Sequence, residues 1–509
     1  MKPGLLFLLT TLWIFSASAT AYFVSPTGDD LNKGNKWFTP FKTIQKSALV
    51  ARAGDTVYIM KGDYNSDDES VLHINRSGNE NAWIVFKNYL NHKPVLHVKN
   101  KFGIWIQSAS YISIEGLSIV SNTIELNPNN TVGTGIFIDG TYTSPCTHLK
   151  IFNNFIQQLS GSGIYAQNFD YLTLSYNKFF SNSLLSENEA AIYLKNAIDI
   201  DGQKAYHNFI QGNVFEKNGM NKSTDPKSCG SAIHLDYNPK YLNSKESKTL
   251  IHNNIIYKSG GGGLQINGAL GLDIVNNTFY KNSEREICRK PEIEIINSSG
   301  FNVLNNIFYS SPAKPGNAII NSGDIHFQNN LYYNFSSMDH GVDDLIANPE
   351  FEMTDDKNST FNFRLKGNSP AINAGVDKFL SDIDFEGNTR KMDTHVDLGA
   401  LEFINRVLPS LKNIKAGIQS KGIQSFWSSL YTKDQKMYTI WNQQNLGFSI
   451  RLFDGQGNLI LEKIRSDTDQ ASFEIDFNVF PVGFYTVISY NSNSKHIERI
   501  LVETRAKTQ

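Results

Sequence analysis

Side chains that could do chemistry recur at alternate positions of a short repeated segment. The segment reads TGIFID, SGIYAQ, AAIYLK, SAIHLD and GGLQIN in successive copies. If each copy is a β-strand, its apolar residues face inwards and two columns of aromatic and polar residues face outwards. The first column contains Phe137, Tyr165, Tyr193, His234, Gln265 and Glu294, and the second contains Asp139, Gln167, Lys195, Asp236 and Asn267.

Lys195 is the only lysine in these two columns, and it is the candidate for a general base. A lysine takes up a proton at neutral pH only if its pKa falls from about 10.4, which desolvation or a nearby divalent cation would cause. His234, on the next copy, is the candidate for a proton donor or an orienting group. The alternatives are a surface lysine paired with Asp236 or Asp139, and a histidine that is simply hydrogen-bonded on a wet strand face.

Three carboxylates near Lys195 could supply the oxygen ligands that calcium prefers. Asp199 and Asp201 form a D-x-D pair in the segment AIDIDG, and Asp236 lies in the second outward column. The alternative for the pair is that both aspartates form turns. Sugar rings stack on tyrosine and phenylalanine, and polar or charged side chains can hold their substituents. We therefore expect the two columns to bind sugar; the alternative is that this face is an inert polar surface. The predicted substrate-binding residues are Asp139, Tyr165, Gln167, Tyr193, Gln265 and Asn267.

The elements that position these residues are predicted from a second repeated feature. An Asn lies between two short β-branched and aromatic runs in each copy, and no helical period accompanies it. Such repeats are typical of a parallel β-solenoid, in which each coil covers the core of the one before. We expect the Asn residues to stack at one corner, because Asn tolerates left-handed backbone angles and stacked amides form ladders. These residues are Asn154, Asn177, Asn213, Asn254, Asn277, Asn306 and Asn330.

The spacing of the alternating segments indicates where a site would be built. They begin at steps of 28, 28, 41, 31 and 29 residues, and the longest step has its extra residues around NAIDIDGQKAYHN and NGMNKSTDPKSCG. Loops added to a regular scaffold commonly carry function, so the coils around residues 193–237 are the expected location.

Both ends of the chain differ from the repeat. Residues 1–21 have a lysine, an apolar run and A-x-A sites, which predicts a cleavable signal peptide and an exported protein. Pro40 to Arg52 has Phe41, Ile44, Ala48 and Leu49 at helical spacing, which predicts a short capping helix at the open end of the solenoid. Residues 404–424 are predicted to be a linker, and residues 425–509 a small antiparallel β-sandwich.

Charge and cysteine content narrow the classes of partner. The chain has 47 Lys and Arg against 49 Asp and Glu, so its overall charge favours neither nucleic acid nor membrane. Its three cysteines, Cys146, Cys229 and Cys288, are too few for a disulfide framework or a zinc site, and at most one bridge is expected. We expect a monomer.

Residues 22–403 resemble the right-handed parallel β-helix proteins of the pectate lyase-like superfamily. The resemblance rests on the opening YFVSPTGDD and PFKTIQKSALVARAGDTVYIMKGDY and on the ending NPEF, FRLKGNSPAINAG and VDLGALEF. It implies an all-β fold of this type and a secreted polysaccharide lyase that cleaves a pectate-like uronic acid polymer by β-elimination. In one lyase family of this superfamily the base is a lysine and calcium neutralises the substrate carboxylate, which would correspond here to Lys195 and to Asp199, Asp201 and Asp236.

The C-terminal segment resembles the sorting domain of proteins exported by the type IX secretion system of Bacteroidota. The residues that carry this resemblance are Leu452, Phe453, Asp454, Gly457, Phe480, Pro481, Gly483, Tyr485 and Val487. It implies that the secretion machinery is a partner and that the protein is secreted or held at the cell surface. An adhesive β-sandwich is the alternative.

Two other functions are left open by the residues. A glycoside hydrolase needs two facing carboxylates; Asp139 and Asp236 are three rungs apart, about 14 Å, which is too far. Asp236 paired with Asp201 or with Glu294 is still possible. The third class is a glycan-binding surface protein without catalysis.

Overall fold

The computed structural model describes most of the repeat region and the strands that follow it. The described ranges are 19–90, 92–121, 133–184, 190–220, 229–238, 248–312, 314–339, 341–355, 360–378, 381–391 and 394–404, followed by the strands between residues 427 and 502. Most of the predicted signal peptide and of the linker therefore lies outside the described residues. Residues up to 379 together with 395–401 form one compact unit, and residues 380–394 and 402–509 form a second.

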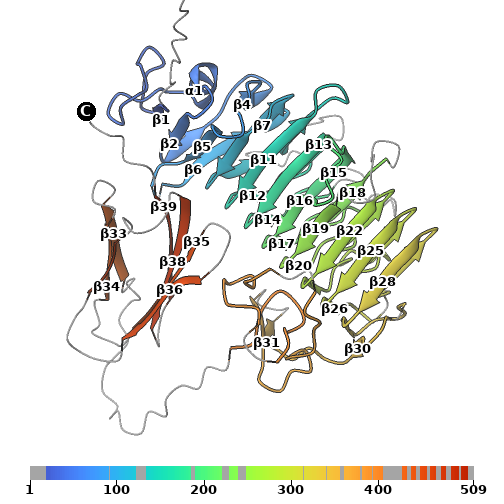
Figure 1. Ribbon diagram of the computed structural model, residues 1–509. Coiled ribbons are helices and arrows are strands. Elements are labelled where there is room, and N and C mark those ends of the chain that lie inside the picture. The colour runs from blue at the N-terminus through green and yellow to red at the C-terminus, as the bar shows by residue number, and fades with distance from the viewer. Residues whose placement is uncertain are drawn as a thin grey trace, which may run out of the picture. The chain divides into compact units, whose positions relative to one another are not determined.

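Three parallel stacks of strands run along the first unit, so the predicted right-handed β-helix is confirmed (Figure 1). The first stack carries the predicted columns. It consists of β4 (Ser70–Ile74), β7 (Phe102–Gln107), β10 (Thr134–Asp139), β13 (Ile164–Ser175), β15 (Ile192–Ala197), β18 (Ile233–Asp236), β21 (Leu264–Asn267), β24 (Ile293–Ile296) and β27 (Asn317–Ile320).

The second stack shares β13 with the first, because this strand continues around the corner between them. Its other members are β1 (Ala21–Val24), β2 (Thr56–Ile59), β5 (Ile84–Asn88), β8 (Ile112–Glu115), β11 (Cys146–Phe152), β16 (Tyr206–Gln211), β19 (Lys248–His252), β22 (Leu270–Val275), β25 (Ser299–Leu304) and β28 (Gly323–Gln328).

The third stack is made of short strands that follow the Asn corner. They are β3 (Gly62–Tyr64), β6 (Pro94–Val98), β9 (Ser118–Ser121), β12 (Phe155–Gln157), β14 (Lys178–Phe180), β17 (Val214–Glu216), β20 (Ile255–Tyr257), β23 (Thr278–Tyr280), β26 (Ile307–Tyr309), β29 (Leu331–Tyr333) and β30 (Leu345–Ile346). The antiparallel pair β31 (Phe351–Asp355) and β32 (Thr360–Leu365) follows them.

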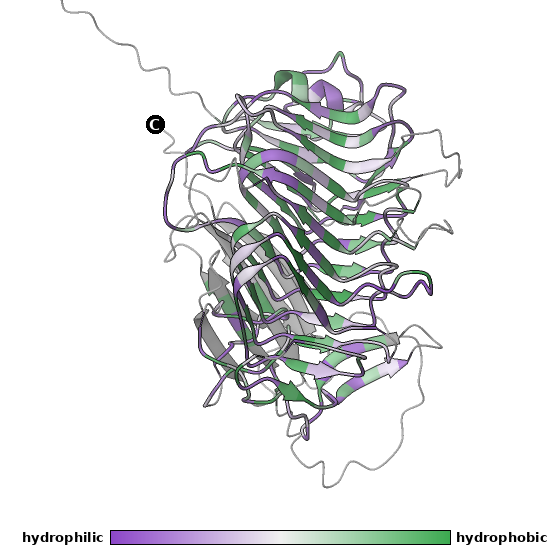
Figure 2. Ribbon diagram, turned by 90° about the vertical axis from the view of Figure 1, so that its right-hand side faces the viewer, coloured by the Kyte–Doolittle hydropathy of each residue, from purple (hydrophilic) through white to green (hydrophobic). Residues whose placement is uncertain are grey.

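The apolar residues of the three stacks form one continuous core. Ile136, Ile164, Ile192 and Ile233 are fully buried and pair in register from coil to coil. In Figure 2 the hydrophobic colour follows the strands along the whole solenoid. Each coil therefore covers the apolar face of its neighbour, as a solenoid requires.

The predicted Asn ladder is confirmed. Asn213, for example, accepts hydrogen bonds from the backbone and the side-chain amide of Asn177, and it donates to Asn254 in turn. The physical reason differs from the predicted one, because the left-handed residues are those just before the ladder. They are Asn153, Tyr176, Gly212, Asn253, Asn276, Asn305 and Asn329.

A helix at the N-terminal end of the solenoid is also present, and it is shorter than predicted. Helix α1 spans Ile44–Val50, and the Thr43 side chain caps it by accepting from the backbone of Lys46. Ile44 and Ser47 are its buried residues, whereas Leu49 is 55% exposed. Leu49 thus does not belong to the predicted apolar face, because Ser47 occupies the inward position and bonds to the Ile44 carbonyl. No helix in the described part of the chain has the length and apolar character needed to cross a bilayer.

The second unit contains the two small antiparallel sheets predicted for the C-terminal segment. One consists of β33 (Trp427–Thr432), β34 (Met437–Asn442) and β37 (Ser472–Asp476). The other consists of β35 (Phe448–Asp454), β36 (Leu459–Arg465), β38 (Gly483–Asn491) and β39 (Lys495–Val502).

Candidate functional site

The outward columns of the first stack have the predicted register. Tyr165 pairs with Tyr193 and Tyr193 with His234, while Gln167 pairs with Lys195 and Lys195 with Asp236. All six side chains are half-buried, because each lies between its neighbours on the adjacent rungs. The columns thus form one continuous face of the solenoid.

The aromatic column is a ladder of rings that stack on one another. The ring centroids of Tyr165 and Tyr193 are 5.2 Å apart with an interplanar angle of 9°, and Phe137 and His234 continue the ladder on either side. The flat faces of Tyr165 and Tyr193 are therefore covered. We expect these two tyrosines to meet a sugar through their hydroxyl edges and not by stacking.

The second column is divided into two hydrogen-bonded groups. Asp139 accepts from the Trp105 indole at 3.1 Å and from the Gln167 amide at 2.8 Å. On the other side of Lys195, Asp236 accepts from the Tyr193 hydroxyl at 3.1 Å and from the Asn267 amide at 2.9 Å. Gln265 and Glu294 follow in the aromatic column, and Glu294 pairs with Lys290.

Lys195 lies between these two groups and bonds to neither. Among the described residues, no carboxylate forms an ion pair with its ammonium group, so the alternative of a lysine paired with Asp236 or Asp139 does not hold. A hollow of about 460 Å³ opens at this end of the strands, and Lys195 lines it together with Asp236, Tyr237, Asn238, Asn267 and Asn297. The hollow thus offers one cation, one carboxylate and several amides to a ligand.

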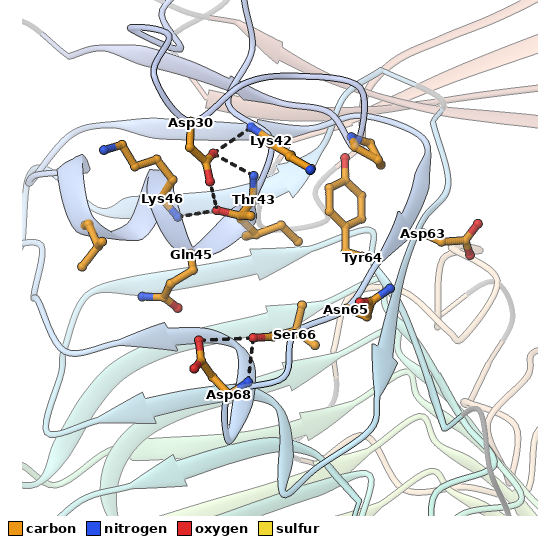
Figure 3. Close-up of a pocket in the computed structure, with 14 residues that line it drawn as sticks. Asp30, Lys42, Thr43, Gln45, Lys46, Asp63, Tyr64, Asn65, Ser66 and Asp68 are labelled. Atoms are coloured by element: carbon orange, nitrogen blue, oxygen red, sulfur yellow. Dashed lines mark hydrogen bonds between the residues drawn. The ribbon is translucent and has the colours of Figure 1, made fainter.

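A second hollow, of about 370 Å³, lies at the N-terminal cap beside α1 (Figure 3). Its carboxylates already hold the backbone or neighbouring side chains. Asp30 accepts from the backbone of Lys42 and from both the backbone and the hydroxyl of Thr43, and Asp68 bonds to Ser66. This hollow is accounted for by the architecture of the cap.

The three predicted metal ligands are not gathered at one point. Asp236 belongs to the Lys195 hollow, whereas Asp199 and Asp201 lie in the loop after β15. Asp199 is 3% exposed and accepts from the backbone of Gly202 at 2.7 Å, so it forms the turn that was the alternative for this residue. Asp201 is exposed and accepts from the Tyr171 hydroxyl at 2.7 Å.

Asp199 instead lies beside two residues that the sequence analysis did not single out. Ligand atoms of Asp170, Asp199 and His207 lie within 4.8 Å of one another, and all three side chains are buried. Burial raises the pKa of Asp170, although its bonds to the backbone and to His207 oppose that rise. Burial would raise the pKa of Asp201 as well, but hydrogen bonds from Gln203 and Tyr171 outweigh it and lower this pKa.

A register signal could have revealed His207 and Tyr171. Both residues precede a ladder Asn by six positions, as His148 does, and the three rings stack with Tyr111 at centroid distances of 4.1 to 4.5 Å. Alignment of the coils on the Asn would have placed these rings in one column. The convergence of Asp170 with Asp199 has no such signal, because it depends on the path of the loop.

The fold defines this chain as a right-handed parallel β-helix protein. Residues 22–226 match the family model described as "Pel9A-like, right handed beta helix region". This match includes Lys195, Asp170, Asp199 and His207, while Asp236 and Asn267 lie beyond it. The chain is also 30% identical over 142 residues to the uncharacterized protein YwoF of Bacillus subtilis (strain 168), an alignment that covers 26% of this chain and 28% of that protein.

The solved structures that match this chain share less of its sequence. A pectate lyase Pel9A structure is 15% identical with a TM-score of 0.44, and the match covers 76% of this chain and 97% of that one. A XylC complex with xylose is 13% identical with a TM-score of 0.45, over 75% and 99% of the two chains. A rhamnogalacturonan lyase is 13% identical with a TM-score of 0.39, over 67% and 92%.

Proposed function

We propose that this protein is a polysaccharide lyase that cleaves a uronic acid polymer by β-elimination in the hollow at Lys195. The observation that carries the proposal is the Lys195 ammonium group, which lies in a polar hollow without an ion-pair partner among the described residues. Elimination needs a base beside the carbon that carries the carboxylate. No described carboxylate holds the Lys195 amine in its charged form, so the amine can serve as this base once it has lost its proton.

In the proposed reaction Lys195, in its neutral form, takes the proton from the carbon next to the carboxylate. The electrons of that C–H bond form a carbon–carbon double bond, and the glycosidic oxygen leaves with its bonding pair and gains a proton. Amides of Asn267 and Asn297 line the same hollow and would bind the substrate. His234, in the aromatic column beside Tyr193, is the proposed proton donor.

Calcium is a separate part of the proposal. Asp236 is the one predicted metal ligand that lines the hollow, so a calcium ion that neutralises the substrate carboxylate would be held by Asp236 with amide oxygens nearby. Removal of calcium with EGTA, followed by its restoration, tests this part. An unchanged rate without calcium would show that the protein's own side chains neutralise the substrate carboxylate.

The test of the reaction is a panel of uronic acid polymers followed by ultraviolet absorbance, because only elimination creates the unsaturated product. Reducing ends without that absorbance would indicate hydrolysis, and binding without cleavage would indicate a glycan-binding protein. The partners considered for Asp236 in a hydrolase are engaged elsewhere, Asp201 with Tyr171 and Glu294 with Lys290. Within the described residues, no specific contact therefore favours hydrolysis.

We also propose that the protein is exported and reaches the cell surface or the medium, with the type IX secretion machinery as its partner. The disulfide between Cys229 and Cys288 supports export, since such bonds persist in oxidising compartments, and it agrees with the expected single bridge. Cys146 is a buried free thiol. Mass spectrometry of the native protein tests the proposal: a chain that retains residues 1–21 would oppose it, and an intact C-terminal segment would favour an adhesive module.

A further inference from the structure

The buried group at the start of β16 is distinct from the Lys195 hollow and has unusual chemistry for a solenoid wall. Asp170 comes from β13, Asp199 from the loop after β15, and His207 from β16, so three consecutive segments meet here. Each of the three side chains is at most 3% exposed. Two carboxylates and one imidazole buried together are costly in their charged forms, unless a proton or a bound cation compensates the carboxylates.

The hydrogen bonds of His207 define which of its nitrogens carries a proton. Its Nε2 lies 3.2 Å from the Gln203 carbonyl oxygen, which can only accept, so Nε2 is the N–H. Its Nδ1 lies 3.0 and 3.1 Å from the two Asp170 oxygens. Nδ1 and the Asp170 oxygens are therefore placed to share either a proton or a metal ion.

The groups around Asp170, Asp199 and His207 orient these side chains as metal ligands are usually oriented. Metal-binding histidines usually donate their other N–H to a carbonyl or a carboxylate, as His207 does to Gln203. Backbone N–H groups orient both carboxylates, from Ile200 to Asp170 at 3.1 Å and from Gly202 to Asp199 at 2.7 Å. With metal–ligand bonds of about 2.1 Å, neighbouring ligand atoms of an octahedral ion are about 3.0 Å apart and opposite ones about 4.2 Å. The ligand atoms here lie within 4.8 Å of one another, so they would draw slightly closer together around an ion.

A separate residue also indicates an incomplete polar site. Tyr237 is 5% exposed, and its hydroxyl has no hydrogen bond of good geometry within the described residues, although Thr249 lies nearby. Burial raises the pKa of this phenol, and the charge of Asp170 adds to the rise. A buried hydroxyl without a partner is costly, unless a ligand or a water completes it.

We propose that Asp170, Asp199 and His207 bind one divalent transition-metal ion, of the class of Zn²⁺ or Mn²⁺, which fastens the loop after β15 to the solenoid. The imidazole nitrogen makes this ion chemically different from the calcium considered for Asp236, since calcium prefers oxygen ligands alone. The inference does not depend on the lyase reaction. Tyr171 and Asp201 complete the outer side, where the Tyr171 hydroxyl contacts both His207 and Asp201.

The test uses the full chain after treatment with EDTA and dialysis. Calorimetric titration with Zn²⁺ and with Mn²⁺ should show one equivalent bound, with Ca²⁺ at least 100-fold weaker, and Co²⁺ should give visible absorption bands. Asp199→Asn and His207→Gln should each weaken Zn²⁺ binding by at least 100-fold. The matched control is His148→Gln, a ring of the same stack that is not a ligand, and it should bind as the wild type does.

Three results would overturn the proposal: no saturable binding of either ion, Ca²⁺ bound more tightly than both, or His207→Gln with unchanged affinity. If circular dichroism shows that His207→Gln does not fold, the Asp199→Asn titration decides in its place. Because metal binding is measured without substrate, an inactive Lys195 site would not affect the outcome. Conversely, elimination activity in a protein that binds no metal would leave the proposed function intact and refute this site.

Discussion

The Tyr193 hydroxyl donates a 3.1 Å hydrogen bond to Asp236 on the next rung, and so joins the aromatic column to the acidic one. Asp236 receives its second hydrogen bond from Asn267, on the rung beyond. The carboxylate is therefore held in place while Lys195, paired with it in register, stays directed at the hollow. The stacking of the coils creates this arrangement.

Tyr193→Phe should lower activity on the responsive polymer by about 10-fold, because Asp236 loses one of two donors and is held less firmly. The change should appear in kcat and KM together if Asp236 positions the substrate. Tyr111→Phe is the matched control, since Tyr111 stacks on His148 in the other column. Equal activities of the two variants would show that the bond to Asp236 has no part in function.

Lys195→Ala should lower the rate by about 100-fold or more, the size of a general-base contribution. The free energy of unfolding should change by less than about 0.5 kcal/mol, since a lysine without a partner contributes little to folding. Lys178→Ala is the control, because Lys178 lies on the third stack in an ion pair with Glu216. Full activity of Lys195→Ala would exclude the proposed base.

Asn213→Ala should destabilise the solenoid by about 3 to 5 kcal/mol, because several buried groups lose their partners at about 1 kcal/mol or more each. Asn213 donates to the Leu174 carbonyl and to Asn254, and it accepts two bonds from Asn177. Urea unfolding followed by fluorescence measures the change. Asn81→Ala, at an exposed position, should be near neutral, and a loss below about 1 kcal/mol for Asn213→Ala would contradict the stabilising role of the ladder.

The parts of the structure that repeat could be predicted from the sequence, since each coil imposes the same register on the next. The columns through Tyr193 and Lys195 and the ladder through Asn213 follow from that periodicity. The group at Asp170 could not be predicted, because residues of three segments meet there through a loop without a period. The path of the same loop also places Asp199 away from Asp236, whereas the sequence analysis had predicted that both bind one ion.

A buried carboxyl group gives the solenoid a pH dependence that can be measured without substrate. Glu292 is 1% exposed, and both its oxygens accept hydrogen bonds from Asn282. Burial raises its pKa from 4.5 to about 8, although the bonds from Asn282 oppose the rise. The folded protein thus holds a proton that the unfolded chain has already lost between these two values.

The stability of the wild type should accordingly be greatest below about pH 4.5 as far as Glu292 is concerned, and this contribution should be lost as the pH rises towards 8. The loss should reach at most about 1.4 kcal/mol per pH unit in that window. Glu292→Gln should flatten the dependence, because its amide cannot ionise, while Glu69→Gln, an exposed residue paired with Lys101, should retain it. Urea midpoints at several pH values decide the matter: equal slopes for the wild type and Glu292→Gln would show that Glu292 is not the buried proton carrier.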